Sequence, residues 1–503
     1  MNIKEAKIQI TNTLRAYLQR DEQGEYCIPA IRQRPVLLMG PPGIGKTQIM
    51  QQIAAETGVG LVSYTITHHT RQSAVGLPFI QTRSFDGVEQ SVTEYTMSEI
   101  LASVYRCMEE SGTREGILFL DEINCASETL APMMLQFLQC KTFGNRALPA
   151  GWLIVAAGNP PEYNRSVREF DVVTLDRVRL MNVAENYEVW KEYARKKNLH
   201  GAITSYLDLK KDHFYRMENT PEGMQFATAR GWEDLAEVVT VHEQLKLPVD
   251  LALVEQYIRI PRIARDFVNY YNLYNKYRRT YCISDILAGG STRLLEQQFA
   301  AAPFDEKIAV MGLMFSALSD GAAKAMRQDE FTEQVYRSLK DFQLRSAAGE
   351  PAAILEETCR QKHTELKRDS AAGRADRRRS AVCRQELSFL QDCLDRMKQE
   401  EITTPQDAMA LCRELFSDEV AQREALADRT GAMFDHAYAF LNAAVGDGQE
   451  IVLFTTEITS GYDTSLYVQN FGCDAYFRAS RDLMIDDTRS SILEDIRELH
   501  AEA

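Results

Sequence analysis

A stretch near the start of the chain has the residue types and spacing that hold phosphate groups. It follows the apolar run at residues 36–39, precedes the helical stretch TQIMQQIAAET, and consists of Gly40, Pro41, Pro42, Gly43, Ile44, Gly45, Lys46 and Thr47. Its glycines let successive backbone N–H groups point inward toward a phosphate group, and the positive end of the following helix also attracts this anion. We expect Lys46 to contact the β- and γ-phosphates of a nucleoside triphosphate and Thr47 to ligate Mg²⁺. A glycine-rich turn without nucleotide is the alternative.

Two adjacent carboxylates, Asp121 and Glu122, end the apolar run at residues 117–120. Such a run is typical of a strand buried on both faces, with its C-terminal end at the ligand edge of a parallel sheet. We expect Asp121 to bind Mg²⁺ through its water shell. Glu122 is expected to point away from the metal and to polarise the attacking water. The pair predicts hydrolysis of the bound nucleotide, with an acidic helix cap as the alternative.

Further polar groups follow at the positions where a γ-phosphate would need them. Asn159 comes after the apolar run LIVAAG, where its amide can bond both the γ-phosphate and the attacking water; a loop cap is the alternative. Arg177 lies in TLDRVRL, between a helical stretch and the run LMNV, where an arginine can reach the γ-phosphate of a neighbouring copy. Arg179, Arg165 and Arg168 compete with Arg177 for that role.

The pattern of the surrounding sequence predicts the elements that position these groups. Residues 3–19 have the spacing of an amphipathic helix. Short apolar runs then alternate with helical stretches, which predicts a parallel sheet with flanking helices. We expect an N-terminal helix in residues 1–30, an α/β nucleotide-binding domain in 31–185, a helical lid in 186–288 and a mostly α-helical C-terminal domain in 289–503.

Composition limits the class of protein. The 503 residues predict two to four domains, and 45% hydrophobic with 26% charged residues excludes a collagen-like or wholly disordered chain. A net charge of −15 argues against wrapping duplex DNA. Ten scattered cysteines without a C-x-x-C pair fit reduced thiols. With no signal peptide and no run approaching about 18 apolar residues, we expect a soluble, cytoplasmic protein without a membrane span.

Two features outside the phosphate pattern allow a second interpretation. Tyrosines interleaved with basic residues could stack on single-stranded nucleic acid, but their helical spacing favours packing against the lid or the C-terminal domain; they are Tyr270, Tyr271, Tyr274, Tyr277 and Tyr281. The charged segment KRDSAAGRADRRRS, with Arg374 and the arginines at 377–379, could bind an anionic partner. A solvated linker or helix tip is the simpler interpretation.

The motifs GPPGIGKT, ILFLDEIN, AAGNPPEYN, TLDRVRL and FATARGWEDL together resemble those of AAA+ ATPases, and within them the MoxR group, over about residues 30–285. The resemblance implies an α/β wedge with a helical lid, assembled as a ring that is usually hexameric, with each site at a subunit interface. It assigns the following roles: Walker A to Lys46 and Thr47, Walker B to Asp121 and Glu122, sensor 1 to Asn159, the arginine finger to Arg177, and sensor 2 to Arg230. The family usually has proline before the lid arginine, where this chain has Ala229.

The resemblance also implies partners. Members commonly act with a separate protein that bears a von Willebrand factor A domain, whose metal site begins D-x-S-x-S. That motif is absent from this sequence, so such a partner would act in trans. We therefore expect a ring that remodels, assembles or activates a client protein. The alternatives are a DNA-acting AAA+ motor of restriction or loader type, and a scaffold that binds nucleotide only to order a ring.

Overall fold

The computed structural model describes residues 1–68, 70, 72, 74, 76–85, 88–143, 146–163, 167, 170–220, 223–346, 349–372, 377–446 and 448–481. These residues form two compact units. Unit 1 comprises Met1–Val189 and Glu357–Leu387, and unit 2 comprises Trp190–Glu356 and the described residues from Ser388 onward. The division after Val189 lies close to the boundary expected at 185. The boundary expected at 288 falls inside unit 2.

Unit 1 is built on a five-stranded sheet in the order β2–β5–β8–β1–β9. Its strands are β1 (Val36–Met39), β2 (Gly60–Thr65), β5 (Gly116–Asp121), β8 (Trp152–Gly158) and β9 (Arg179–Asn182). All four neighbouring pairs are parallel. This confirms the α/β fold expected from the apolar runs, and each run lies within one residue of a strand.

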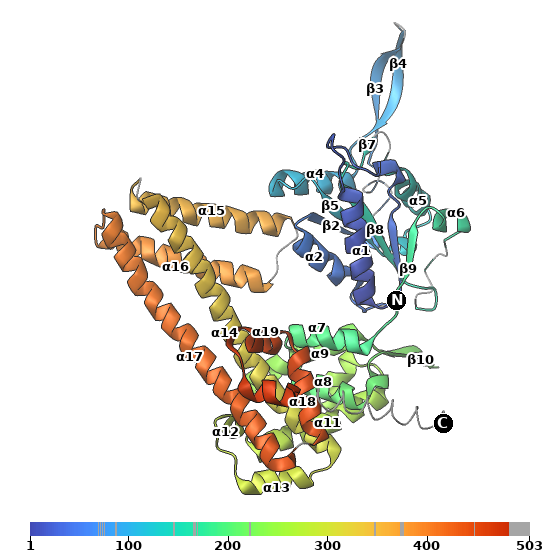
Figure 1. Cartoon of the computed structure of the whole chain (residues 1–503). Coiled ribbons are helices and arrows are strands. Elements are labelled where there is room, and N and C mark those ends of the chain that lie inside the picture. The colour runs from blue at the N-terminus through green and yellow to red at the C-terminus, as the bar shows by residue number, and fades with distance from the viewer. Residues whose placement is uncertain are drawn as a thin grey trace, which may run out of the picture. The chain divides into compact units, whose positions relative to one another are not determined.

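Helices cover both faces of this sheet (Figure 1), as a parallel sheet requires. They are α1 (Ile3–Leu18), α2 (Lys46–Thr57), α4 (Glu99–Ser111) and α5 (Ala131–Cys140). Alternate residues of each strand face opposite ways, so Leu118 packs in the core beneath α4 and α5, whereas Phe119 packs in the core beneath α1 and α2. Asn2 and Glu5 form a capping box that fixes the start of α1.

Among the described residues of the N-terminal part of unit 1, two antiparallel hairpins and three short 3-10 turns accompany the sheet. The longer hairpin pairs β3 (Pro78–Phe85) with β4 (Val88–Tyr95) and projects from the rest of the unit (Figure 1). The shorter pairs β6 (Thr142–Phe143) with β7 (Arg146–Ala147). The turns are η1 (Ala30–Arg32), η2 (Ile66–His68) and η3 (Ile123–Cys125), and a short helix, α6 (Val172–Leu175), precedes β9.

A distant segment of the chain completes the edge of the sheet in unit 1. Helices α15 (Pro351–Ala371) and α16 (Arg377–Gln399) both extend into this unit. The Leu61 N–H on the edge strand β2 donates to the Ala372 carbonyl at 3.0 Å, and Ala372 is fully buried. The described parts of the charged segment are the C-terminal end of α15, with Ala372, and the N-terminal end of α16. Arg374 lies outside the described residues.

The first part of unit 2 is mostly helical, as expected for residues 186–288. Its helices are α7 (Tyr187–Lys196), α8 (Gly201–Leu209), α9 (Ala229–Leu245), α10 (Leu251–Tyr257), α11 (Pro261–Tyr281), α12 (Ile283–Leu287) and α13 (Arg293–Ala301), with the turn η4 (Lys211–His213) after α8. An antiparallel hairpin of β10 (Arg216–Thr220) and β11 (Gly223–Ala227) interrupts them, an element that the helical periodicity did not predict. The tyrosines of α11 pack: Tyr271, Tyr274 and Tyr281 are buried.

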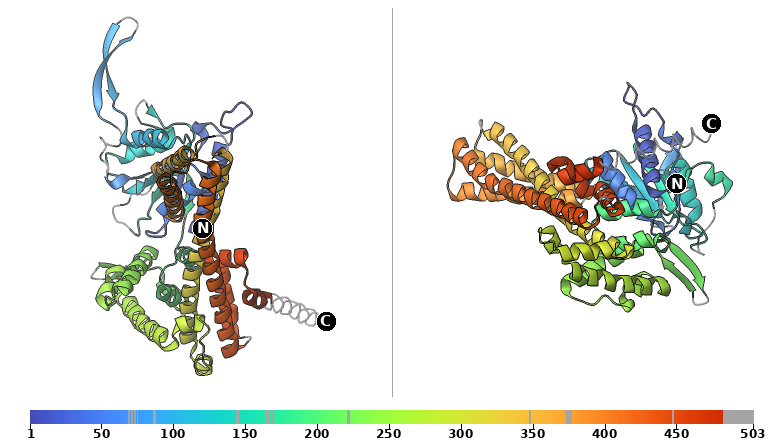
Figure 2. Two further views of the ribbon diagram at one scale, coloured as in Figure 1. Left: turned by 90° about the vertical axis from the view of Figure 1, so that its left-hand side faces the viewer. Right: turned by 60° about the horizontal axis from the view of Figure 1, so that its bottom comes forward.

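Two long helices dominate the rest of unit 2. They are α14 (Phe304–Ser346) and α17 (Pro405–Val445), which lie side by side in both views of Figure 2. Gly321 lies against Thr430 while Gln328 donates to Glu419, so the two helices run antiparallel. Helices α18 (Gln449–Ser460) and α19 (Tyr462–Phe471) follow.

Among the described helices, α14 alone is long and apolar enough to cross a membrane by length and composition. Of its apolar window, 56% is buried inside the protein. Such burial is typical of a core helix.

Candidate active site

The phosphate-binding loop connects β1 to α2 and wraps around a lysine. Gly43 and Gly45 have positive φ angles of 76° and 95°, a region that glycine enters without a steric penalty. The Lys46 ammonium is buried and donates to the carbonyl oxygens of Gly40 at 2.7 Å and Pro41 at 2.8 Å. The loop therefore encloses a positive charge at the start of α2, where the helix dipole also favours an anion.

Asn159 lies beside this lysine because of the strand order. Strand β8 runs between β1 and β5, so the residue that follows β8 emerges between the phosphate loop and the carboxylates. The Lys46 ammonium donates to the Asn159 side-chain oxygen at 2.8 Å. The Asn124 side-chain amide donates to the Asn159 carbonyl at 2.8 Å and fixes the backbone there. Among the described residues, the buried side-chain oxygen of Asn124 has no hydrogen-bond partner.

The carboxylates of Asp121 and Glu122 lie at the same edge of the sheet. The Thr47 hydroxyl donates to one Asp121 oxygen at 2.9 Å, which places both expected magnesium ligands side by side. The other Asp121 oxygen accepts from the Glu122 N–H at 2.9 Å. Glu122 has a φ of 55°, which is uncommon for a residue other than glycine and marks a backbone held in place by its surroundings.

A threonine outside the predicted set holds the Glu122 carboxylate. Thr67, in the turn η2 directly after β2, donates its hydroxyl to Glu122 at 2.8 Å. Strands β2 and β5 are paired so that Thr65 lies opposite Asp121, and the residues that follow therefore meet at the same edge. Thr67 orients the glutamate that is expected to polarise water.

The arginines before β9 differ in where their side chains lie. Arg177 is exposed and donates to Gln139 on α5. Arg179 begins β9, is half-buried, and donates to the Thr13 hydroxyl of α1 at 2.6 Å. Both arginines are hydrogen-bonded within unit 1, but Arg177 is exposed whereas Arg179 is half-buried, so exposure favours Arg177 for a contact with a neighbouring copy. Arg165 and Arg168 lie outside the described residues.

Arg230, the expected sensor 2, belongs to unit 2. It lies in the first turn of α9, where the Thr228 hydroxyl accepts from the Gly231 N–H at 3.1 Å and caps the helix. Its side chain is exposed. Asp234 lies one turn along; burial raises the pKa of this carboxyl, while the Arg230 charge acts in the opposite direction.

The donor set of unit 1 fits a magnesium nucleotide. Main-chain N–H groups at the start of α2 and the Lys46 ammonium suit a polyphosphate, and the Thr47 hydroxyl with the Asp121 carboxylate supplies the hard oxygen ligands that Mg²⁺ prefers. The structure thus brings together, within one unit, five of the predicted site residues: Lys46, Thr47, Asp121, Glu122 and Asn159.

Sequence reasoning missed Thr67, Asn124 and Gln139. Signals for the first two were present in the sequence. Thr67 follows an apolar run that must end at the same sheet edge as Asp121, and Asn124 stands two residues after Glu122 in ILFLDEIN. Gln139 carries no local signal, because its role depends on how α5 packs beside Arg177.

Comparison with known proteins agrees with this geometry. Residues 35–178 match the family model described as AAA domain (dynein-related subfamily). A stretch of 91 residues, 18% of this chain, is 36% identical to the ATPase family gene 2 protein homolog B of Bos taurus. The match covers 9% of the length of that relative. Residues 35–178 of this chain therefore form an AAA domain of the kind found in AAA+ ATPases.

Proposed function

We propose that this chain hydrolyses ATP and, assembled as a ring, uses the energy to remodel, assemble or activate a partner protein. One observation carries the hydrolytic part: Lys46 contacts Asn159 at 2.8 Å, Thr47 contacts Asp121 at 2.9 Å, and Glu122 lies next to Asp121 at the same edge. A site for binding nucleotide alone has no need of this glutamate and amide.

The residues divide the work between binding and charge stabilisation. The phosphate loop and Lys46 hold the β- and γ-phosphates, while Asn159 bonds the γ-phosphate and orients the attacking water. Glu122 accepts a proton from that water as it attacks. When bound at Thr47 and Asp121, Mg²⁺ neutralises charge on the phosphate oxygens.

The proposal of a ring rests on the surface around Arg177. Val172 and Val173, in α6 beside it, are 82% and 56% exposed, an apolar surface that a second copy would cover. Supplied from a neighbour, Arg177 would stabilise the γ-phosphate during transfer, an effect worth roughly 10³ to 10⁵ in rate in related phosphoryl transfers. A hexamer is the expected ring.

We propose a protein client, with a von Willebrand factor A domain protein acting in trans. The support is the MoxR-like set of motifs, which includes FATARGWEDL around Arg230. The net charge of −15 disfavours the alternative of a DNA-acting motor.

The test compares Glu122→Gln with wild-type protein and with Glu110→Gln, a control at an exposed position on α4. We expect Glu122→Gln to bind ATP like wild type but to lose turnover by about 10² or more, because the water loses its base. Glu110→Gln should hydrolyse ATP normally. Unchanged turnover in Glu122→Gln would contradict the proposed active site.

The ring and its partner need separate readouts. Wild-type turnover per chain should rise with protein concentration, and sedimentation with ATP should show the assembly; a monomer with full activity would refute the ring. Glu122→Gln assemblies should retain a protein partner. Stimulation of turnover by duplex DNA, suppressed by salt, would instead favour the motor.

A further inference from the structure

Helix α11 of unit 2 carries a basic stripe on its exposed face. The stripe consists of four cations and two amides, all of them exposed: Arg262, Arg265, Asn269, Asn272, Lys276 and Arg279. Successive members are three or four residues apart, so all six lie on one side of the helix. At a rise of about 1.5 Å for each residue, the basic stripe is about 26 Å long.

The opposite face of α11 fixes how the helix is turned. Its buried residues include Ile263, Phe267, Tyr271, Tyr274 and Tyr281. The Tyr271 hydroxyl donates to Glu243 on α9 at 3.0 Å, and the Tyr281 hydroxyl donates to Glu306 on α14 at 2.7 Å. Because these contacts hold the tyrosine face against the neighbouring helices, the basic stripe stays at the surface.

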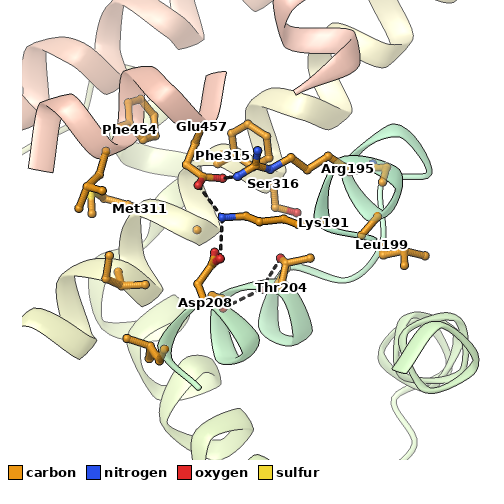
Figure 3. Close-up of a pocket in the computed structure, with 18 of the residues that line it drawn as sticks. Lys191, Arg195, Leu199, Thr204, Asp208, Met311, Phe315, Ser316, Phe454 and Glu457 are labelled. Carbon is orange, nitrogen blue, oxygen red and sulfur yellow. Dashed lines mark hydrogen bonds and ion pairs between the residues drawn. The ribbon is translucent and has the colours of Figure 1, made fainter. Parts of the chain in front are cut away.

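Many other cations of unit 2 are neutralised by an acid close by. The buried Lys191 ammonium lies between Asp208 at 2.6 Å and Glu457 at 2.7 Å (Figure 3). On α14, the exposed Arg337 pairs with Glu333 one turn away. Both arrangements cancel the positive charge within the unit itself.

The basic stripe has no such neutralisation in the described part of the chain, where no acid forms an ion pair with any of its four cations. Along the sequence, Asp266 is the one acid within a turn of a stripe cation, Arg262, and its carboxylate is taken by Lys210. Glu243 pairs with Arg278, which lies outside the stripe, at 2.8 Å. Four positive charges therefore remain together on one face, in a chain whose net charge is −15.

The chemistry of the basic stripe fits carboxylates on a protein. Three of its four cations are arginines, whose guanidinium presents a rigid fork of N–H donors that matches two carboxylate oxygens. No member of the stripe is aromatic, and Tyr271, Tyr274 and Tyr281 are buried, so single-stranded nucleic acid finds no platform on which its bases could stack. The net charge of −15 disfavours duplex DNA, because the surface beyond the stripe would repel its phosphates.

We propose that the basic stripe of α11 is a docking surface for an acidic segment of a partner protein, with carboxylates spread over about 26 Å. Acids of the partner would pair with Arg262 and Arg265 at one end and with Lys276 and Arg279 at the other. The two asparagines between these pairs would donate their side-chain N–H groups to further carboxylates. Since no residue of the candidate active site takes part, docking at the stripe stands independently of ATP hydrolysis.

Fluorescence polarisation of the full chain with a rhodamine-labelled peptide of about 20 glutamates, long enough to cover the stripe, tests the proposal. We expect binding at about 50 mM salt that weakens at least about tenfold at about 500 mM, because salt screens exposed ion pairs. A peptide of the same length that alternates glutamate and lysine has no net charge. It should bind at least about tenfold more weakly than the glutamate peptide.

Two double variants separate the basic stripe from the overall charge of the chain. Arg262→Gln with Arg265→Gln removes two charges from the stripe and should weaken binding of the glutamate peptide at least about fivefold. Lys324→Gln with Lys340→Gln removes the same charge from exposed positions on α14. This control should leave the Kd within about twofold of wild type.

A gain of affinity guards against misfolding of the variants. Asn269→Arg adds a cation at the centre of the stripe and should strengthen binding at least about twofold, whereas a damaged fold can only weaken it. The proposal would be overturned if wild type failed to bind the glutamate peptide at millimolar concentration, if both double variants weakened binding equally, or if Asn269→Arg bound no more tightly. Tighter binding of a DNA oligonucleotide of equal charge, lost with the same two arginines, would assign the stripe to nucleic acid instead.

Discussion

Lys141 lets the cost of a buried charge be measured in unit 1. It follows α5 with a φ of 56° and is 7% exposed, and its ammonium has no hydrogen-bond acceptor among the described residues. Burial lowers the pKa of Lys141 from its ordinary 10.5 to about 8. We predict that Lys141→Met, which keeps the side-chain length and removes the charge, stabilises unit 1 at pH 7.

The fall in the pKa of Lys141 from 10.5 to about 8 sets the size of the change in the free energy of unfolding. At about 1.4 kcal/mol for each pH unit, it corresponds to about 3 kcal/mol at pH 7, where the lysine is charged in both folded and unfolded chains. Above pH 8 the folded protein releases the proton and the cost falls. By about pH 10.5 the unfolded chain releases it too, so the advantage of Lys141→Met should disappear as the pH rises from 8 to 10.5.

Urea titration measures the free energy of unfolding of wild type and Lys141→Met at each pH. Mass spectrometry of the protease-resistant peptides that contain β5 and β8 follows the unfolding of unit 1 alone. Lys246→Met is the matched control, because Lys246 has a φ of 57° at the end of α9 but is exposed. The control should change stability by less than about 0.5 kcal/mol. A Lys141→Met variant that is destabilised at pH 7, or whose advantage is as large at pH 10 as at pH 7, would refute the reasoning.

Three further predictions concern the candidate active site. Thr67→Val should lower kcat about tenfold with little change in nucleotide affinity, because the Glu122 carboxylate loses the hydrogen bond that orients it. Steady-state kinetics measures kcat, and nucleotide titration measures the affinity. Asn124→Ala should lower kcat by about two- to tenfold, since the Asn159 carbonyl loses its donor, and an unchanged rate would remove Asn124 from the site. Arg177→Gln should abolish turnover, because each site loses the arginine supplied by the neighbouring copy. Mixing Arg177→Gln with Lys46→Ala should restore some activity, since Lys46→Ala supplies Arg177 to the intact site of its neighbour. Arg179→Gln should instead lower the melting temperature, because its bond to the Thr13 hydroxyl is lost.

The sequence predicted the strand ends at which the candidate site lies, because the signals for these are local. A glycine pattern between a strand and a helix, and carboxylates at the end of a buried run, depend on neighbours in the chain. The hairpin of β10 and β11 was missed because RMENT and GMQFA contain residues that also suit helices, and pairing across the turn decides their conformation. Thr67 and Gln139 owe their roles to contacts between separate elements, which periodicity does not report.

The hydrogen bond from Leu61 to Ala372 has a consequence for synthesis of the chain. The ribosome completes residues 1–189 about 170 residues before it reaches the segment that finishes unit 1, a delay of roughly 8 to 35 s at typical elongation rates. During that delay the outer edge of β2 lacks the Ala372 carbonyl and can pair with strands of other chains. The nascent unit 1 is therefore most prone to aggregation in this interval, and a chain truncated before Glu357 would keep that vulnerability permanently.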